Sequence, residues 1–432
     1  MLNFVRRTID HFFPDLSDLI EESCIDTRRK ASIKYSISEI VLAAVFLHTC
    51  KAGSRNSMNQ DRSEPVFKKN YRELFGFRLP HMDTVNDVMK KLPEEMLERL
   101  RKKMIRCLLT KRVFHKYRFL GEYFVIALDA TGIFTFEKSP YPNCPYKTSK
   151  TGKRTYHQPV LEAKLVTRNG FSISLCTEWI INEDGASKQD CEYKAGLRLM
   201  KKLKRDYPRL PMCIVLDGLY AKQPIMSQIS QNNWKYIIVW KDKTMYAQQD
   251  KVQEHRDAGL TVKSTKEKYH NQIKKTIREY EHDPNEIKYK TESIWYARLV
   301  EIHKNLKKPE EEKRTKFVFM TNVKVTKDNV MELIEAGRLR WKIENEGFNI
   351  QKNHEYHLHH KMSRGNINAI KNYYLCLQIA HLLDQLILKC KNRPFSKNKT
   401  VKKLWEYFTS ALRIMEDFCF PKSGKRYNYR FE

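Results

Sequence analysis

The chain has 432 residues, 41% hydrophobic and 31% charged, which is long enough for two or three domains with at least one sizeable core. It contains no run of about 18 apolar residues, and its N-terminus lacks the pattern of a secretory signal, so we expect a chain in the reducing cytoplasm rather than in a membrane. The formal net charge of +30 favours a polyanionic partner over a merely solvated basic surface, because lysine and arginine bind phosphates and release counter-ions.

The first 118 residues are predicted to form a helical region. Residues 38–48 are apolar on nearly every side, which is typical of a buried helix, and they begin with a Ser-Glu pair that favours a helix N-terminus. Residues 84–118 combine helical periodicity with many lysines and arginines, and Pro93 indicates a break and restart. Contact with DNA and a solvated outer surface explain these basic faces equally well.

The pattern changes near residue 120, where apolar β-type runs begin. Strands are predicted over 123–128, 161–166, 171–180, 212–216, 236–240 and 317–320, with the hairpin signal Asn169-Gly170 between the second and third. Helices are predicted over 190–205, 223–231, 328–353 and 365–390, and residues 241–312 form a polar insertion with short strand-like pieces. This order predicts an α/β fold, with a mixed sheet and helices on both of its faces.

Two of the predicted strands end in an aspartate, Asp129 after VIAL and Asp217 after CIVL. A carboxylate at the end of a buried strand is costly without a partner, and ligands bind at strand ends in α/β sheets. If the two strands are neighbours, the carboxylates converge, and paired hard oxygen ligands favour Mg²⁺ or Mn²⁺. Taken singly, each aspartate is better explained as a cap that starts the following turn.

The segment RLRWKIENEGFNIQKN supplies a third acidic group. On an α-helix of about 100° per residue, Glu344 shares a face with Arg340 and Gln351, whereas Glu346 points almost opposite. Only one of the two glutamates can therefore face a site with the aspartates. The alternative for Glu344 is a solvated ion pair with Arg340 four residues before it.

Together these residues resemble the DDE transposases of the IS4-like insertion-sequence group. That family has a ribonuclease-H-like core with one Asp on the first strand, a second Asp on the fourth strand and a Glu on a late helix. Asp129, Asp217 and Glu344 match this order. The gaps are 217 − 129 = 88 and 344 − 217 = 127 residues, and the long second gap fits the β-rich insertion that the family carries there.

The family also carries a Tyr-x2-Arg-x3-Glu-x6-Lys signature, which Arg340 and Glu344 match. The chain departs from it at Gly337, where the family has Tyr, and at Gln351, where the family has Lys. Lys352 follows one residue late. The shift leaves three interpretations: Lys352 acts from a rotated position, the second glutamate of the segment is the ligand, or this copy is inactive. The matches favour Glu344 as the third acidic residue.

The resemblance implies that Asp129, Asp217 and Glu344 lie within metal-sharing distance and hold two Mg²⁺ or Mn²⁺ ions per active site. These ions would activate a water and then a 3′-hydroxyl for in-line attack at phosphorus, which cuts transposon ends and joins them to target DNA. A flipped base is expected to stack on Trp341 or on another aromatic side chain from the insertion, Trp240 or Trp295. Contacts with substrate DNA are expected from Arg340, Trp341 and Lys352, and from Lys147, Lys150 and Arg154 in the basic loop KTSKTGKR. His157, placed in the loop before Leu161, is a further expected contact.

The resemblance also implies the domain organisation and the partners. A helical DNA-binding region over 1–118 precedes the ribonuclease-H-like core, which is split into 119–240 and 316–360 by an insertion over 241–315; a helical C-terminal region covers 361–432. The expected partner is double-stranded DNA, as terminal inverted repeats and target, bound by a homodimer in the cytoplasm and nucleoid of a prokaryote. The alternatives are an inactive or repurposed DNA-binding descendant, and a ribonuclease-H-like nuclease that cuts without joining.

Overall fold

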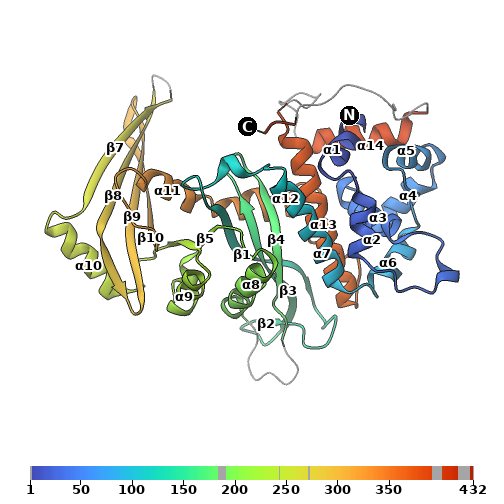
Figure 1. Ribbon diagram of the computed structural model, residues 1–432, viewed down its shortest axis with the longest axis horizontal. Coiled ribbons are helices and arrows are strands. Elements are labelled where there is room, and N and C mark those ends of the chain that lie inside the picture. Colours follow the sequence, from blue (N-terminus) through green and yellow to red (C-terminus); the bar gives the residue numbers. More distant parts are fainter. Residues whose placement is uncertain are drawn as a thin grey trace.

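The fold has three parts arranged along the long axis of the molecule. A computed structural model of the chain describes residues 2–182, 191–242, 244–270, 273–391, 401–416 and 429–431. A helical part lies at one end, a mixed sheet with flanking helices in the middle, and a long antiparallel ribbon at the other end (Figure 1). Within the described ranges, no helix is long and apolar enough to cross a membrane.

The helical part combines both ends of the chain. Its N-terminal elements are α1 (Leu2–Phe12), α2 (Leu16–Ser23), η1 (Lys30–Ser32), α3 (Ile37–Thr49), α4 (Arg55–Ser63), α5 (Pro65–Phe75), α6 (Met82–Met89), α7 (Glu94–Thr110) and η2 (His115–Tyr117). The predicted buried helix is α3, in which every residue is buried, and a capping box of Ser36 and Glu39 closes its first turn. From the C-terminal side, α13 (Ile367–Lys389) packs against α3 and α7, and α14 (Val401–Ile414) against α5.

The central sheet has the strand order β4-β3-β1-β5-β6, with the short β2 at the free edge of β3. Strands β3 and β4 are antiparallel to their neighbours, whereas β5 and β6 run parallel to β1. The bounds are β1 (Phe124–Phe136), β2 (Tyr146–Thr148), β3 (Arg154–Val166), β4 (Ser172–Trp179), α8 (Glu192–Asp206), β5 (Met212–Leu216), η3 (Gly218–Tyr220), α9 (Gln223–Gln231) and β6 (Lys235–Val239). Three antiparallel strands followed by two parallel ones confirm the predicted ribonuclease-H-like α/β class. Asp190, the predicted start of α8, lies outside the described residues.

The strands of this sheet are buried on both faces, which explains their continuous apolar runs. Along β1, Phe124, Ile126 and Leu128 enter a core shared with α8 and the helical part. Val125 and Ala127 enter a second core on the opposite face. The second core also contains residues of α11 (Val330–Arg338) and of the segment that follows it. Residues at every second position share a face, so Asp129 lies on the face of β1 that the segment after α11 covers.

The predicted insertion forms α10 (Tyr246–Asp257), β7 (Val262–Tyr269), β8 (Lys274–Tyr289), β9 (Glu292–Asn305) and β10 (Lys308–Thr321). The expectation of short strand pieces is wrong, because these are long strands that join the central sheet. The end of β10 pairs with β6, so all ten strands form one sheet. Charged residues at consecutive positions, such as Lys266, Glu267 and Lys268 of β7, lie on both faces of the ribbon. They remove the alternation that identifies a strand. The predicted boundary at residue 315 falls inside β10.

The expectation of one uninterrupted α-helix over 328–353 is also wrong. Helix α11 ends at Arg338, a π-helical segment η4 (Ile343–Phe348) follows, and α12 (Asn349–Asn353) completes the run. Two glycines bring this run close to the sheet. A Cβ added at Gly337 would lie 2.8 Å from the Phe319 ring, and one at Gly347 would lie 2.9 Å from Ser172 Oγ. Glycine also weakens an α-helix.

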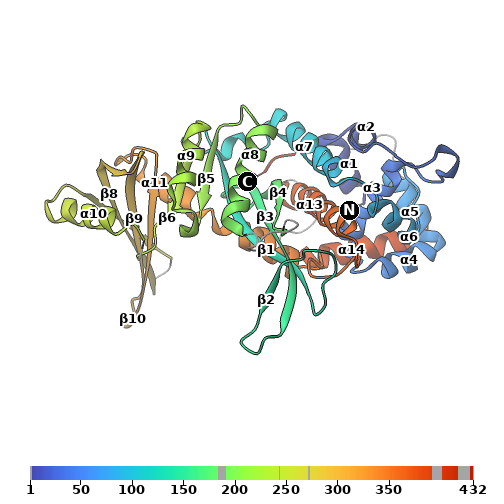
Figure 2. The ribbon, with the colours of Figure 1, turned by 90° about the horizontal axis from the view of Figure 1, so that it is seen from below.

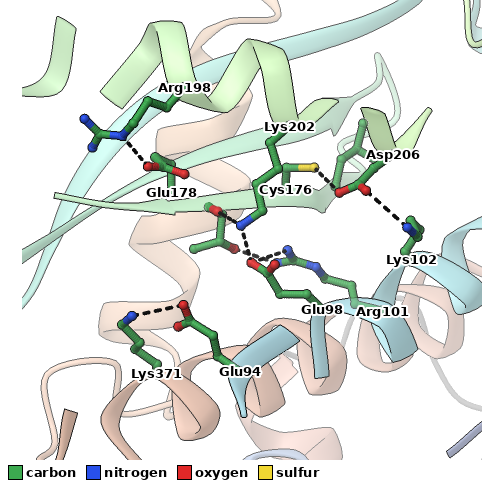
Figure 3. A network of polar contacts seen from close by, with 12 residues as sticks. Glu94, Glu98, Arg101, Lys102, Cys176, Glu178, Arg198, Lys202, Asp206 and Lys371 are labelled. Carbon is green, nitrogen blue, oxygen red and sulfur yellow. Dashed lines mark hydrogen bonds and ion pairs between the residues drawn. The ribbon is translucent and has the colours of Figure 1, made fainter. Parts of the chain in front are cut away.

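A buried polar network joins the helical part to the sheet (Figure 3). Arg101 of α7, 2% exposed, donates hydrogen bonds to the hydroxyls of Ser174 (2.7 Å) and Thr177 (2.6 Å) of β4. Lys202 of α8 pairs with Glu98 of α7 at 2.6 Å. These contacts hold α7 against the sheet through charged groups that are removed from water, so a change that leaves one of them unpaired is expected to be costly.

Candidate active site

Asp129 and Asp217 lie at the same level of two neighbouring parallel strands. The pairing of β1 with β5 runs from Phe124 opposite Met212 to Ala127 opposite Val215, and each aspartate comes two residues later. Continued in the same register, the two backbones lie about 4.8 Å apart, the usual spacing of neighbouring strands. Cys213 and Val215 belong to the same core as Val125 and Ala127, so both aspartates project from one face of the sheet.

The surroundings of Asp129 raise the pKa of its carboxyl group. Its side chain is 26% exposed, and Oδ2 lies 3.5 Å from Nη1 of Arg340. Burial, together with the nearby charges of Glu192 and Glu344, raises the pKa of this carboxyl to about 6, although Arg340 and the backbone N–H of Ala130 act in the opposite direction. The positive charge of Arg340 is therefore too small an effect to offset burial and the neighbouring carboxylates.

The pKa of Asp217 is shifted in the opposite direction from that of Asp129. Burial alone would raise its pKa, but Lys241, the N–H of Leu219 and Arg340 outweigh burial and lower the pKa below its ordinary value. Lys241 Nζ lies 2.6 Å from Oδ1, and the Leu219 N–H donates to the same oxygen at 3.1 Å. Lys241 was not among the site residues predicted from the sequence. It lies two residues after the end of β6, and its place just beyond the strand next to β5 is the sequence signal that could have identified it.

The π-helical segment carries the two candidate glutamates on different sides. The charge of Glu344 acts on Asp129 and on the buried Lys164. Glu346 instead pairs with Lys342 at 2.9 Å and lies beside Gly170 in the turn between β3 and β4. The structure thus brings Glu344 near the first aspartate and engages Glu346 elsewhere.

The π-helical turn explains the late lysine of the signature. A π-helix bonds residue i to i+5 rather than i+4, so its turn holds one extra residue and sets later residues back by one position on the helix surface. Lys352, eight residues after Glu344, therefore takes the place of the seventh residue in an unbroken α-helix. Gln351 turns inward: it is fully buried, and its amide donates to Gln378 Oε1 at 2.9 Å. Lys352 stays partly exposed.

Packing also explains the departure at Gly337. A Cβ at this position would meet the Phe319 ring at 2.8 Å and Ile237 Cγ2 at 2.9 Å. The tyrosine of the family signature therefore has no room here, because α11 lies directly on β6 and β10. The departure follows from close helix–sheet packing, a structural cause that does not require the loss of the active site.

A further carboxylate, Glu192, was also absent from the residues predicted from the sequence. It opens α8, and Tyr220 Oη donates to its Oε1 at 2.9 Å. Burial and the charge of Asp217 raise its pKa, against the lowering effect of the Tyr220 hydrogen bond. Glu192 also contributes to the raised pKa of Asp129. The sequence has no apolar β run before Glu192, so no local pattern marks it.

The predicted basic loop is the hairpin between β2 and β3, which projects from the body of the molecule (Figure 2). Lys147 and Lys150 are exposed, and the Arg154 guanidinium lies 4.6 Å from the Tyr146 ring. His157 lies in β3 and not in a loop as expected. It pairs with Thr135, six residues beyond Asp129 and so roughly 20 Å along the strand. The hairpin is accessible to DNA, but His157 is not beside the carboxylates.

Trp341 lies at the surface near the carboxylates, with 50% of its surface exposed. The Arg340 guanidinium sits 5.2 Å from its ring centroid, a cation–π distance. Trp240, considered as another base-stacking residue, is 4% exposed and donates its Nε1–H to Thr244 O at 3.2 Å. Of these two indoles, Trp341 is the one that a base can reach.

The expected metal-sharing arrangement is not met in this structure. In the part of the chain that is described, no three His, Cys, Asp or Glu side chains are close enough to hold an ion together. The two aspartates pair instead with Arg340 and Lys241. The donor set still fits a divalent cation: four carboxylates (Asp129, Asp217, Glu192 and Glu344) interact across the site, and hard oxygen donors suit Mg²⁺ and Mn²⁺.

Comparison with known proteins identifies the family. The sequence profile described as "Transposase DDE domain" matches residues 121–383, more than half of the chain. The chain belongs to this transposase family. Members of the family are enzymes that act on DNA and generally use divalent metal ions. The match includes Asp129, Asp217 and Glu344, and the narrower IS4-like subgroup stays a prediction.

The other comparisons add less about this transposase-family chain. A solved structure, the cryo-EM structure of a piggyBac transposase synaptic complex with hairpin DNA, is similar over 95% of this chain and 80% of that chain. Its TM-score is 0.37 and its sequence identity 9%, which is too distant to support a functional argument. No curated protein matches the chain.

Proposed function

We propose that this chain is an active DDE transposase that cuts DNA at transposon ends and joins it to target DNA with Mg²⁺ or Mn²⁺. The observation that carries the proposal is the shared level of Asp129 and Asp217 on neighbouring parallel strands, with Glu344 acting on the first of them. This arrangement lies within the region that matches the transposase domain. An IS4-like member is the narrower form of the proposal.

Asp129, Asp217 and Glu344 would hold two divalent ions, with Glu192 as a further acidic neighbour. Such ions, when bound, polarise the attacking oxygen and stabilise the leaving 3′-oxygen. The protein supplies the orientation: Arg340 and Lys352 bind phosphate oxygens beside the carboxylates. Trp341 offers its exposed ring to an unstacked base.

DNA binding in this proposal draws on the whole surface. The net charge of +30 favours a long polyanion, and the β2–β3 hairpin places Lys147, Lys150 and Arg154 where a duplex can reach them. The helices over 1–118 are proposed to bind the inverted repeats. A homodimer is proposed because strand transfer must hold two transposon ends together.

Cleavage of DNA that carries the flanking terminal repeats tests this function. The wild type with Mg²⁺ is expected to nick or excise the end. Asp217→Ala is expected to lose at least about 1,000-fold in rate, the order seen when one member of a catalytic set is removed. The measurement is product formation on labelled duplex, with repeat binding by each protein followed in parallel.

The other outcomes separate the alternatives. Equal activity of both proteins would indicate a contaminant or another active site. No cleavage by either, with repeat binding intact, would favour an inactive DNA-binding descendant. Cleavage without dependence on the repeats, and without joined products, would favour a nuclease.

Lys352 is predicted to contact a DNA phosphate. Lys352→Gln should weaken binding to the transposon end and reduce the salt dependence of the binding constant by about 0.9 in log–log slope, the value for one lost phosphate contact. The matched control is Lys342→Gln, which removes the same charge from the same helical run where the lysine pairs with Glu346. Fluorescence anisotropy over a salt series measures both. Equal slopes for the two variants would contradict the assignment of Lys352.

A further inference from the structure

The backbone at Lys241, beside Asp217, is held in place by hydrogen bonds. It follows β6, where the N–H of the preceding Trp240 donates to Val318 O at 2.9 Å. The Lys241 carbonyl accepts from the hydroxyl of Thr244 at 2.9 Å and from the amide of Gln249 at 3.0 Å. The backbone is thus held from both sides. The side chain is 53% exposed, so its end can move while its base stays in place.

The stem of Lys241 reaches Asp217 through space that Gly218 leaves open. A Cβ added at Gly218 would lie 2.9 Å from Lys241 Cγ, 3.0 Å from Cδ and 2.9 Å from the carbonyl oxygen of Val239. Any side chain there would displace the lysine stem. The absence of one lets Nζ approach Asp217 Oδ1 to 2.6 Å.

Lys241 and Arg340 differ in how readily each can move away from the aspartate with which it pairs. Arg340 is only 13% exposed and lies 3.5 Å from Asp129, whereas Lys241 is 53% exposed on a flexible stem. A lysine ammonium is a compact charge with rotatable bonds, unlike the planar guanidinium. Lys241 pairs with one of the two carboxylate oxygens of Asp217, the group to which a divalent ion would bind. Because like charges repel, an ammonium and a divalent ion on the same carboxylate disfavour each other.

We propose that Lys241 is an exchangeable counter-ion of the active site. Without a divalent ion it neutralises Asp217. When an ion binds to Asp217, the ammonium moves away and binds a non-bridging phosphate oxygen of the DNA held at the site. The inference rests on the proposed function, in which Asp217 holds a metal ion and the site holds DNA.

The first test is Mn²⁺ binding to the full-length protein without DNA, measured by electron paramagnetic resonance. Lys241→Met keeps the stem and removes the charge, so Mn²⁺ should bind about fivefold more tightly, the upper range for the loss of a partly exposed ion pair. Lys241→Arg should stay within about twofold of wild type. The control Lys235→Met removes the same charge at the far end of β6, where Nζ lies 5.9 Å from the Tyr123 ring, and should leave affinity unchanged. Equal or weaker Mn²⁺ binding by Lys241→Met would overturn the proposal.

The second test is affinity for a transposon-end duplex in Ca²⁺, which measures binding without requiring cleavage. Lys241→Met should bind this duplex about fivefold more weakly than Lys235→Met, because only the first variant loses the phosphate contact. Equal affinities would overturn the phosphate contact. Neither test depends on turnover, so a wild type that fails to cut DNA would count against the proposed function and leave both results on Lys241 interpretable.

Discussion

Replacing Glu344 by glutamine is expected to reduce DNA cleavage at least about 1,000-fold, whereas the same change at Glu346 leaves cleavage within about twofold. Both substitutions remove one negative charge from the same π-helical segment. Glu344 acts electrostatically on Asp129, but Glu346 is paired with Lys342 at 2.9 Å. The measurement is single-turnover cleavage of a transposon-end duplex at saturating Mg²⁺ by the two variants and the wild type.

The pair of variants also tests the interpretation of the π-helical turn. If Glu346→Gln loses cleavage and Glu344→Gln keeps it, the third acidic residue is assigned to the wrong side of the segment. Thermal unfolding of both proteins serves as the control, because Gly347, the residue after Glu346, packs closely on Ser172 and a folding defect would lower cleavage without any role in chemistry. Similar unfolding midpoints with different cleavage rates support the assignment.

Replacing the buried Arg101 by methionine is expected to lower the free energy of unfolding by about 3–5 kcal/mol, the usual cost of leaving one member of a buried ion pair alone. Arg101 is 2% exposed and Glu162 is fully buried. The two charges interact, and the hydroxyls of Ser174 and Thr177 bridge them. Urea titration followed by circular dichroism measures the change.

Two further variants show whether charge is the cause. The double variant Arg101→Met with Glu162→Gln removes both charges and should recover at least about 1 kcal/mol of the loss, since contacting residues are not additive. Arg99→Met, on the exposed side of α7, should stay within about 0.5 kcal/mol of wild type. If Arg99→Met and Arg101→Met lower the free energy of unfolding equally, the loss comes from a general effect on α7 and not from the buried ion pair.

Much of the core fold could be predicted because its signals are local. The apolar run of β1, the Asn-Gly turn before β4 and the buried helix α3 each follow from a few neighbouring residues. The two strand-end aspartates follow from the same patterns. The ribbon could not be predicted in length, because charged side chains on both faces of β7 and β8 remove the alternation of a half-buried strand.

The sequence by itself determined the order of the core strands and helices over 123–240 and the two strand-end aspartates. It also narrowed the third acidic residue to Glu344 or Glu346. Only the tertiary structure decided which side of the helical run each glutamate takes, because a π-helical turn shifts the register after Ile343. It also decided the places of Lys241 and Glu192 beside the aspartates and the burial of Gln351. Strand ends and helix faces depend on nearest neighbours in the chain. These other features depend on contacts between residues far apart in sequence, which periodicity and spacing do not contain.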